Sequence, residues 1–148
     1  RLWADPTSAT GRLPAHADLD LQTSMQRLVQ EVDPDRVMMV QLADGERVHP
    51  LTPFLQVPGM PKLLSWSRNA RLFPCEEELG GYLPIREVAN ACLNQLGYTG
   101  WVSMEVFTRT TGDPKASVPN EHAARAARSW RRILEQLDTK GEKGCSGY

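Results

Sequence analysis

The sequence lacks three features that would assign it quickly: an excess of one charge, paired cysteines and a long apolar run. Its 17 Lys and Arg residues almost balance its 18 Asp and Glu residues, and the formal net charge is −1. A chain of this charge has no general attraction for nucleic acid or for an anionic membrane, so we expect neither as a partner. No apolar stretch approaches the roughly 18 residues that span a bilayer.

Cysteine usage argues against a domain that is stabilised by disulfide bonds or by a structural zinc ion. The cysteines are Cys75, Cys92 and Cys145, an odd number with no CxxC spacing. A disulfide framework and a zinc ribbon are therefore not indicated, and we expect a reducing, cytoplasmic setting. The hydrophobic fraction of 41% and the charged fraction of 24% are ordinary for a single globular domain of 148 residues.

Apolar spacing along the chain alternates between the helical and the strand-like pattern. Strands are expected at 37–42 and 101–107, with a short third one possible at 71–73. Helices are expected at 18–32, 84–96 and 118–137, with Gly97 ending the second. Strands that alternate with helices of these lengths favour βα units around a parallel sheet.

This order predicts an α/β fold that is too small to close a barrel. A (β/α)₈ barrel needs eight strands and about 250 residues, whereas the chain offers two firm strands and one short one. The chain therefore forms either a small open sheet or the C-terminal part of a TIM barrel whose earlier strands lie outside this sequence. We expect residues 1–138 to form that partial barrel domain and residues 139–148 to be a disordered tail.

Two polar residues stand inside the apolar strands. Gln41 follows Val-Met-Met-Val and Glu105 follows Trp-Val-Ser-Met. A buried carboxylate is costly unless it is paired or binds a metal, and hard divalent cations prefer carboxylate and amide oxygens. Gln41 and Glu105 are therefore candidate metal ligands. The alternatives are an ion pair between Glu105 and a nearby arginine, and a simple core hydrogen bond for Gln41.

Three blocks of the sequence resemble the xylose-isomerase-like TIM barrels, the sugar phosphate isomerase/epimerase superfamily. They are MVQLADGER at 39–47, SWSRNARLFP at 65–74 and GYTGWVSMEVF at 97–107. The second block is similar in particular to the 3-dehydroshikimate dehydratases of quinate catabolism. The opening WADPTS at 3–8 and PNEHAARAARSW at 119–130 fit the same subgroup.

The resemblance implies a divalent metal, Mg²⁺, Mn²⁺ or Co²⁺, held by four residues on different strands. Gln41 matches the ligand on strand six of the barrel and Glu105 the ligand on strand eight. The other two ligands and the catalytic base would belong to strands that precede residue 1. The substrate-binding serine and arginine fall on Ser67 and Arg71, with Arg68 as a competing choice for the substrate carboxylate.

The implied reaction is the loss of water from 3-dehydroshikimate, a small carboxylated cyclic compound, to give protocatechuate. A sugar isomerase or epimerase on the same barrel is one alternative, and Arg71 discriminates because a neutral sugar does not need it. A non-catalytic fragment is another alternative. A homo-oligomer or a complementary chain could supply the missing elements, because an open barrel edge invites pairing.

Three further positions carry weaker expectations. Asp44 and Glu46 follow the first strand and are expected to be solvated loop acids, with supporting roles at the site as the alternative. Cys75 stands after Leu-Phe-Pro, where the family resemblance implies glycine. We therefore expect the cysteine side chain to change the backbone of this loop, because glycine tolerates positive φ and cysteine does so poorly.

Overall fold

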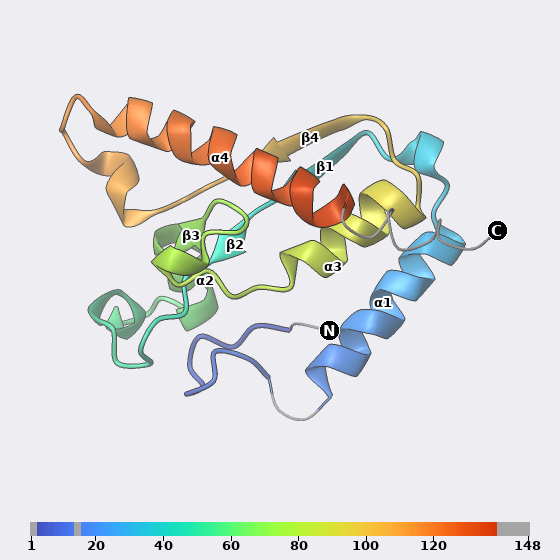
Figure 1. The fold of residues 1–148 in the computed structure, drawn as a ribbon. Coiled ribbons are helices and arrows are strands. Elements are labelled where there is room, and N and C mark those ends of the chain that lie inside the picture. Colours follow the sequence, from blue (N-terminus) through green and yellow to red (C-terminus); the bar gives the residue numbers. More distant parts are fainter. Residues whose placement is uncertain (1–2, 14–15, 139–148) are drawn as a thin grey trace.

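The computed structural model describes residues 3–13 and 16–138, and Figure 1 shows their fold. The predicted disorder of residues 139–148 falls outside the described residues. The helices are α1 (Ala17–Glu31), α2 (Lys62–Asn69), α3 (Ile85–Ala89) and α4 (Val118–Asp138), and α3 continues as a π-helical stretch over Asn90–Gln95. The strands are β1 (Met39–Leu42), β2 (Asp44–Gly45), β3 (Arg71–Leu72) and β4 (Trp101–Met104).

The two strands expected from the apolar runs pair directly with each other. β1 and β4 run parallel, with Met39 opposite Trp101 and Leu42 opposite Met104. Parallel pairing requires a crossover, which the chain makes through α2, β3 and α3. The expectation of an α/β fold with parallel strands is therefore confirmed at this level.

The third expected strand forms as β3, but it does not join β1 and β4 in one parallel sheet. β3 pairs antiparallel with β2, with Asp44 opposite Leu72 and Gly45 opposite Arg71. Only Ala43 separates the end of β1 from the start of β2. The pairing of β3 with β2 therefore places β3 beyond the ends of β1 and β4 and not between them. Gly45 permits this arrangement, because the ring of Trp66 on α2 fills the space that a side chain at position 45 would need.

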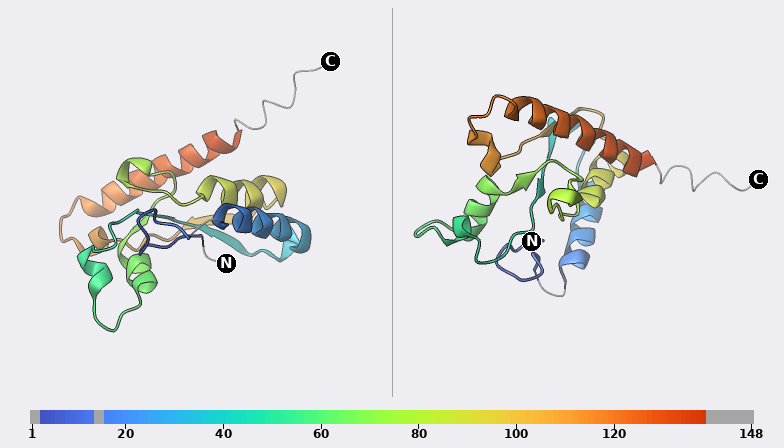
Figure 2. Two further views of the ribbon diagram at one scale, coloured as in Figure 1. Left: turned by 90° about the horizontal axis from the view of Figure 1, so that it is seen from below. Right: turned by 60° about the vertical axis from the view of Figure 1, so that its left-hand side comes forward.

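All the helices that build the core lie on one face of the β1–β4 pair. Val40 and Leu42 of β1 pack with Ala89 of α3, Cys92 of the π-helical stretch, and Ile133 of α4. Figure 2 shows α3 and α4 on the same side of the two strands. Gly97, with φ of 74°, ends the helical run as expected.

The opposite face of the pair, called here the uncovered face, consists of Met39, Gln41, Trp101 and Ser103. These residues alternate along the strands with the core residues, so they point away from the helices. Trp101 is 83% exposed, and Met38, just before β1, is 91% exposed. Among the described residues, no helix is both long and apolar enough to cross a membrane.

The backbone at residue 75 has a positive φ, the conformation that glycine tolerates, so the expected change of the loop away from it is not seen. Cys75 has φ of 63°, the only positive φ of a non-glycine residue in the described part of the chain. Its side chain is also buried in the core cluster. A position of this kind accepts a small unbranched side chain and penalises a β-branched one.

We predict that Cys75→Val lowers the free energy of unfolding by about 2 kcal/mol, because valine adds bulk to the core and strains the left-handed backbone. Cys75→Gly should change it by less than about 1 kcal/mol, since relief of strain offsets lost burial. Urea unfolding followed by circular dichroism measures both. Cys92→Val is the matched control, buried in helical backbone. A loss for Cys92→Val as large as that for Cys75→Val would contradict the backbone explanation.

Candidate functional site

A pocket of about 310 Å³ opens at the carboxyl end of β1. β1 provides Gln41, the following turn and β2 provide Ala43 and Asp44, and α2 provides Trp66 and Ser67. Ala70, Arg71 and Leu83 complete the lining. Three of the residues expected to form a site, Gln41, Ser67 and Arg71, therefore come together on one pocket.

Arg71 is held in place by contacts from three directions. Its Nε donates to the carbonyl of Ser67 at 3.0 Å, one helical turn earlier. Its Nη1 donates to the carboxylate of Glu105 at 2.5 Å and to the Glu105 carbonyl at 3.2 Å. The guanidinium also lies over the ring of Phe107, 5.1 Å from its centre. A guanidinium fixed in this way presents a preformed donor to an anion.

Arg68 lies apart from this arrangement. It is exposed near the end of α2 and does not line the pocket. Ser67, on α2, lines the pocket with Arg71, and its hydroxyl donates to the Leu64 carbonyl at 2.9 Å. The geometry therefore favours Arg71 over Arg68 as the pocket cation.

Glu105 forms an ion pair with Arg71, which was the alternative to a metal-ligand role in the sequence analysis. The pair with Arg71 joins the segment after β4 to β3. Gln41 lies one register step before the end of β1, and its Nε2 donates to the Ser103 hydroxyl of β4 at 3.4 Å. That orientation leaves the amide oxygen of Gln41 available to another partner.

The donor set is compatible with half of a hard-cation site. Gln41 and Glu105 offer an amide oxygen and a carboxylate near the carboxyl ends of neighbouring parallel strands. Oxygen donors of this kind suit Mg²⁺ and Mn²⁺. In residues 3–13 and 16–138, no group of three or more His, Cys, Asp or Glu side chains is arranged to hold a metal. A complete site would therefore need ligands from outside these residues.

Asp44 is the pocket residue that the sequence reasoning undervalued. The expectation of a solvated loop acid is wrong, because Asp44 is only 4% exposed. Its Oδ1 accepts hydrogen bonds from the backbone N–H groups of Gly45, Tyr82 and Leu83 at 2.7, 3.1 and 2.9 Å. Burial raises the pKa of Asp44 in spite of these bonds. An aspartate followed directly by glycine at the end of an apolar strand was the available sequence signal.

Glu46 takes a different role from Asp44. It is partly buried and pairs with Arg109 at 2.6 Å. The guanidinium of Arg109 also lies 5.2 Å from the centre of the Phe54 ring, so this pair ties the long loop to the segment after β4. Glu46 is therefore a structural group and lies outside the Arg71 pocket.

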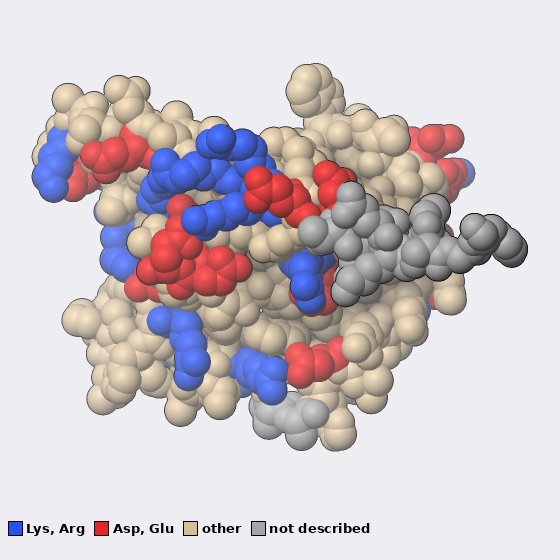
Figure 3. Space-filling model, viewed as in Figure 1, with Lys and Arg blue, Asp and Glu red and all other residues tan. Residues whose placement is uncertain are grey.

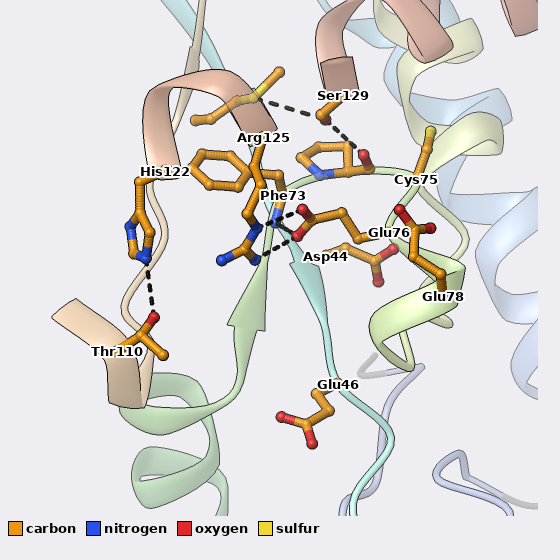
Figure 4. Close-up of polar contacts among 12 residues, drawn as sticks. Asp44, Glu46, Phe73, Cys75, Glu76, Glu78, Thr110, His122, Arg125 and Ser129 are labelled. Atoms are coloured by element: carbon orange, nitrogen blue, oxygen red, sulfur yellow. Dashed lines mark hydrogen bonds and ion pairs between the residues drawn. The ribbon is translucent and has the colours of Figure 1, made fainter. Parts of the chain in front are cut away.

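The chain that leaves β3 is fastened to α4, and this stretch, residues 73–78, is called the anchor segment. Glu76 accepts two hydrogen bonds of 2.7 Å from Arg125, while its Oε2 also accepts the Phe73 N–H at 3.0 Å. Figure 4 shows Arg125 between Glu76 and the Phe73 ring, whose centre is 5.3 Å from the guanidinium carbon. The pair is sheltered, with side chains 5% and 17% exposed for Glu76 and Arg125.

Two further side chains of α4 donate hydrogen bonds to backbone carbonyls of the anchor segment. Ser129 donates to the Pro74 carbonyl at 2.5 Å. Arg132 donates to the Cys75 carbonyl at 2.5 Å and pairs with Glu78 at 2.8 Å. Figure 3 shows Lys and Arg side chains next to Asp and Glu side chains on the face of the molecule along which α4 runs. The anchor segment therefore fixes the backbone that begins directly after Leu72, next to Arg71.

Together, the fold and the pocket define an α/β protein with a prepositioned arginine, Arg71, at the ends of its strands. No family model matches the chain, and no solved structure matches it. The 3-dehydroshikimate dehydratase of Neurospora crassa is 44% identical to it over 140 residues. That match covers 93% of this chain and 39% of the fungal protein. The resemblance to the 3-dehydroshikimate dehydratases is thereby confirmed, for a chain that spans 39% of that relative's length.

We predict that Glu76→Gln lowers the free energy of unfolding by about 3 kcal/mol, because it leaves the sheltered Arg125 without its counter-charge. Thermal or urea unfolding measures the loss. Glu31→Gln removes the same charge from an exposed pair with Arg27 on α1 and should have little effect. If the two substitutions were equally mild, the Glu76 pair would not be the anchor described above.

We also predict a pH-dependent difference between the wild type and Asp44→Asn. Because the pKa of Asp44 is raised above 3.8, the folded state holds its proton more tightly than the unfolded chain does. The stability that this proton confers is complete below the unfolded pKa and is lost as the pH rises through the folded pKa. The free energy of unfolding of the wild type relative to Asp44→Asn should therefore fall as the pH rises above 3.8.

Urea unfolding of both proteins at a series of pH values measures this difference. Asp35→Asn, at an exposed position, is the control for the loss of one negative charge. A difference that stays flat for Asp44→Asn, or one that rises with pH, would contradict the raised pKa.

Proposed function

We propose that this chain is part of a metal-dependent hydro-lyase that converts 3-dehydroshikimate to protocatechuate with loss of water. Its β and α elements would form the C-terminal part of a (β/α)₈ barrel, with the domain extending over residues 1–138. The observation that carries the proposal is the pocket on which Gln41, Ser67 and Arg71 converge. The proposal is supported by the 44% identity to the 3-dehydroshikimate dehydratase of Neurospora crassa.

The pocket suits a carboxylated substrate better than a neutral sugar. Arg71 is prepositioned by the Ser67 carbonyl and the Phe107 ring, so little side-chain freedom remains to be lost on binding. A substrate carboxylate would replace Glu105 at the guanidinium and form charge-assisted hydrogen bonds there. The neutral ring substrate of a sugar isomerase would have no use for this cation.

Gln41 and Glu105 would be two ligands of the metal in this proposal. A divalent cation would polarise the ketone oxygen of the substrate as a Lewis acid. Exchange of Arg71 from Glu105 to the substrate carboxylate would leave Glu105 free to act as a ligand. Loss of the Arg71 contact to Oε2 would leave both carboxylate oxygens of Glu105 to the metal, so substrate binding and the coordination by Glu105 would be coupled through Arg71.

The residues of this chain would bind and orient the substrate, while the proton transfers would need a base from elsewhere. Dehydration removes a proton from the carbon next to the ketone and expels a hydroxyl group, which leaves as water. Arg71 and Ser67 would hold the carboxylate end, and Trp66 would wall the pocket against solvent. The base and the remaining ligands would come from the length of the relative that this chain does not match.

A chimera in which this chain replaces the matching 140 residues of the Neurospora crassa protein tests the proposal. With Mg²⁺, Mn²⁺ or Co²⁺, it should form protocatechuate, followed by ultraviolet absorbance. Arg71→Gln should lower kcat/KM by about 100-fold or more, because an anchored carboxylate loses its charged partner. Arg68→Gln is the matched control and should stay within about threefold, because Arg68 lies outside the pocket.

Glu105→Ala should abolish turnover and weaken metal binding, measured by titration calorimetry. An inactive chimera, alongside an active parent enzyme, would contradict the assignment of the reaction. A large loss for Arg68→Gln with none for Arg71→Gln would contradict the assignment of the carboxylate site.

A further inference from the structure

A second pocket of about 310 Å³ lies next to the Arg71 pocket and shares two lining residues with it, Asp44 and Leu83. The anchor segment, α3 and α4 provide the rest of its lining, which is Cys75, Glu77, Ile85, Arg86, Glu87 and Gln136. Apart from these two shared residues, its lining differs from that of the Arg71 pocket, so it is a separate site.

The register of β2 and β3 turns the Asp44 side chain toward the second pocket. Gly45 lies opposite Arg71, whereas Asp44 lies opposite Leu72. In an antiparallel pair, opposite residues share a face and successive residues point to opposite faces. Arg71 and the Trp66 ring, which lies against Gly45, both line the Arg71 pocket. The carboxylate of Asp44 therefore projects from the other face of the pair.

One oxygen of this carboxylate has no partner. Oδ1 of Asp44 accepts the three backbone N–H bonds, whereas Oδ2 has no hydrogen-bond donor among the described residues. No enclosed side-chain oxygen or nitrogen in residues 3–13 and 16–138 lacks a partner, so Oδ2 is open to a cavity. It lies 2.7 Å from the position that a Cβ of Gly81 would take, and Figure 4 shows the carboxylate beside the anchor segment. Oδ2 is therefore an acceptor that faces the second pocket.

The charges around this oxygen favour a cationic ligand. Arg86 is the cation among the described lining residues, and it pairs with Glu87 at 3.3 Å. Glu77 forms no ion pair with any described residue, so Asp44 and Glu77 are two carboxylates without a counter-charge. Burial raises the pKa of Asp44, and the charge of Glu77 adds to this effect. A bound cation would offset both contributions.

The rest of the lining suits an organic ammonium ion. In the described part of the chain, no three His, Cys, Asp or Glu side chains are arranged to hold a metal ion. Leu83 and Ile85 form an apolar wall, and burial keeps the Cys75 thiol neutral by raising its pKa to about 11. A primary ammonium group donates up to three hydrogen bonds, and its carbon stem packs on apolar surface.

We propose that the second pocket binds a small primary alkylamine as its ammonium ion. The free oxygen of Asp44 is the main acceptor, and the carbon stem of the amine lies along Leu83 and Ile85. The site goes beyond the proposed function and does not depend on it, because it uses the face of the β2–β3 pair that points away from Arg71.

Titration calorimetry of the purified chain with n-butylammonium chloride tests the proposal. Butan-1-ol has the same stem without the charge and should bind about tenfold more weakly or less, because a charge-assisted hydrogen bond is the stronger one. Asp44→Asn should weaken n-butylammonium binding by about tenfold or more, because the amide has no charge to offer the ammonium group. Asp35→Asn, at an exposed position, is the matched control and should leave the affinity unchanged.

A second pair of variants tests the site without any change to Asp44. Gln136→Lys places an ammonium group on a side chain that lines the pocket, whereas Gln136→Met adds a stem without charge. The lysine variant should melt about 4 °C above the methionine variant, because its own ammonium fills the site. It should also lose the binding of n-butylammonium.

Four results would overturn the proposal. Equal affinities for butan-1-ol and n-butylammonium would make the second pocket an apolar cavity only. Displacement of the amine by an equal concentration of MgCl₂ would make it a site for inorganic cations. The other two are a folded Asp44→Asn that keeps its affinity and equal melting temperatures for the two Gln136 variants. An inactive chimera would count against the proposed reaction alone.

Discussion

The buried pair between Glu76 and Arg125 is the interaction on which the arrangement of the site depends. Glu76 is almost fully enclosed, so its charge is tolerable only because a guanidinium and the Phe73 N–H saturate it. Through this one carboxylate, α4 determines where the chain turns after β3. The position of Arg71 follows, because its backbone is two residues before Phe73 and pairs with β2 on the other side. A helix far from the pocket in sequence thus controls the geometry of its main cation.

The Arg71–Glu105 pair gives the pocket a resting state. Each charge is neutralised by the other, and the guanidinium is further held by the Ser67 carbonyl. In the proposed function, an anionic substrate would compete with Glu105 for a donor that is already desolvated on one side by Phe107. This arrangement reconciles the two readings of Glu105 that the sequence left open, because the ion pair belongs to the resting state and the ligand role is proposed for the occupied one.

Much of the fold follows from local pattern, whereas the site depends on contacts that pattern does not contain. Strands β1 and β4 are predictable because a short apolar run between turn residues is typical of a buried strand. The antiparallel pairing of β3 is not, since it depends on Gly45 and on the Trp66 ring beside it. The only local signal for the burial of Asp44 is the glycine that follows it, because its other N–H partners, Tyr82 and Leu83, lie almost 40 residues away. Position 75 could be singled out because its side chain departs from a glycine pattern, although its positive φ was not predicted.

The contact between Gly45 and Trp66 has a consequence for how this protein and its relatives can diverge. The indole ring occupies the volume of any side chain at residue 45, and its Nε1 donates to the Glu46 carbonyl at 2.9 Å, so the ring has no room to withdraw. The two positions are therefore expected to change together during evolution. A relative with alanine or serine at the position of Gly45 should carry a smaller ring or an aliphatic residue at that of Trp66, and α2 should lie farther from β2 in that protein.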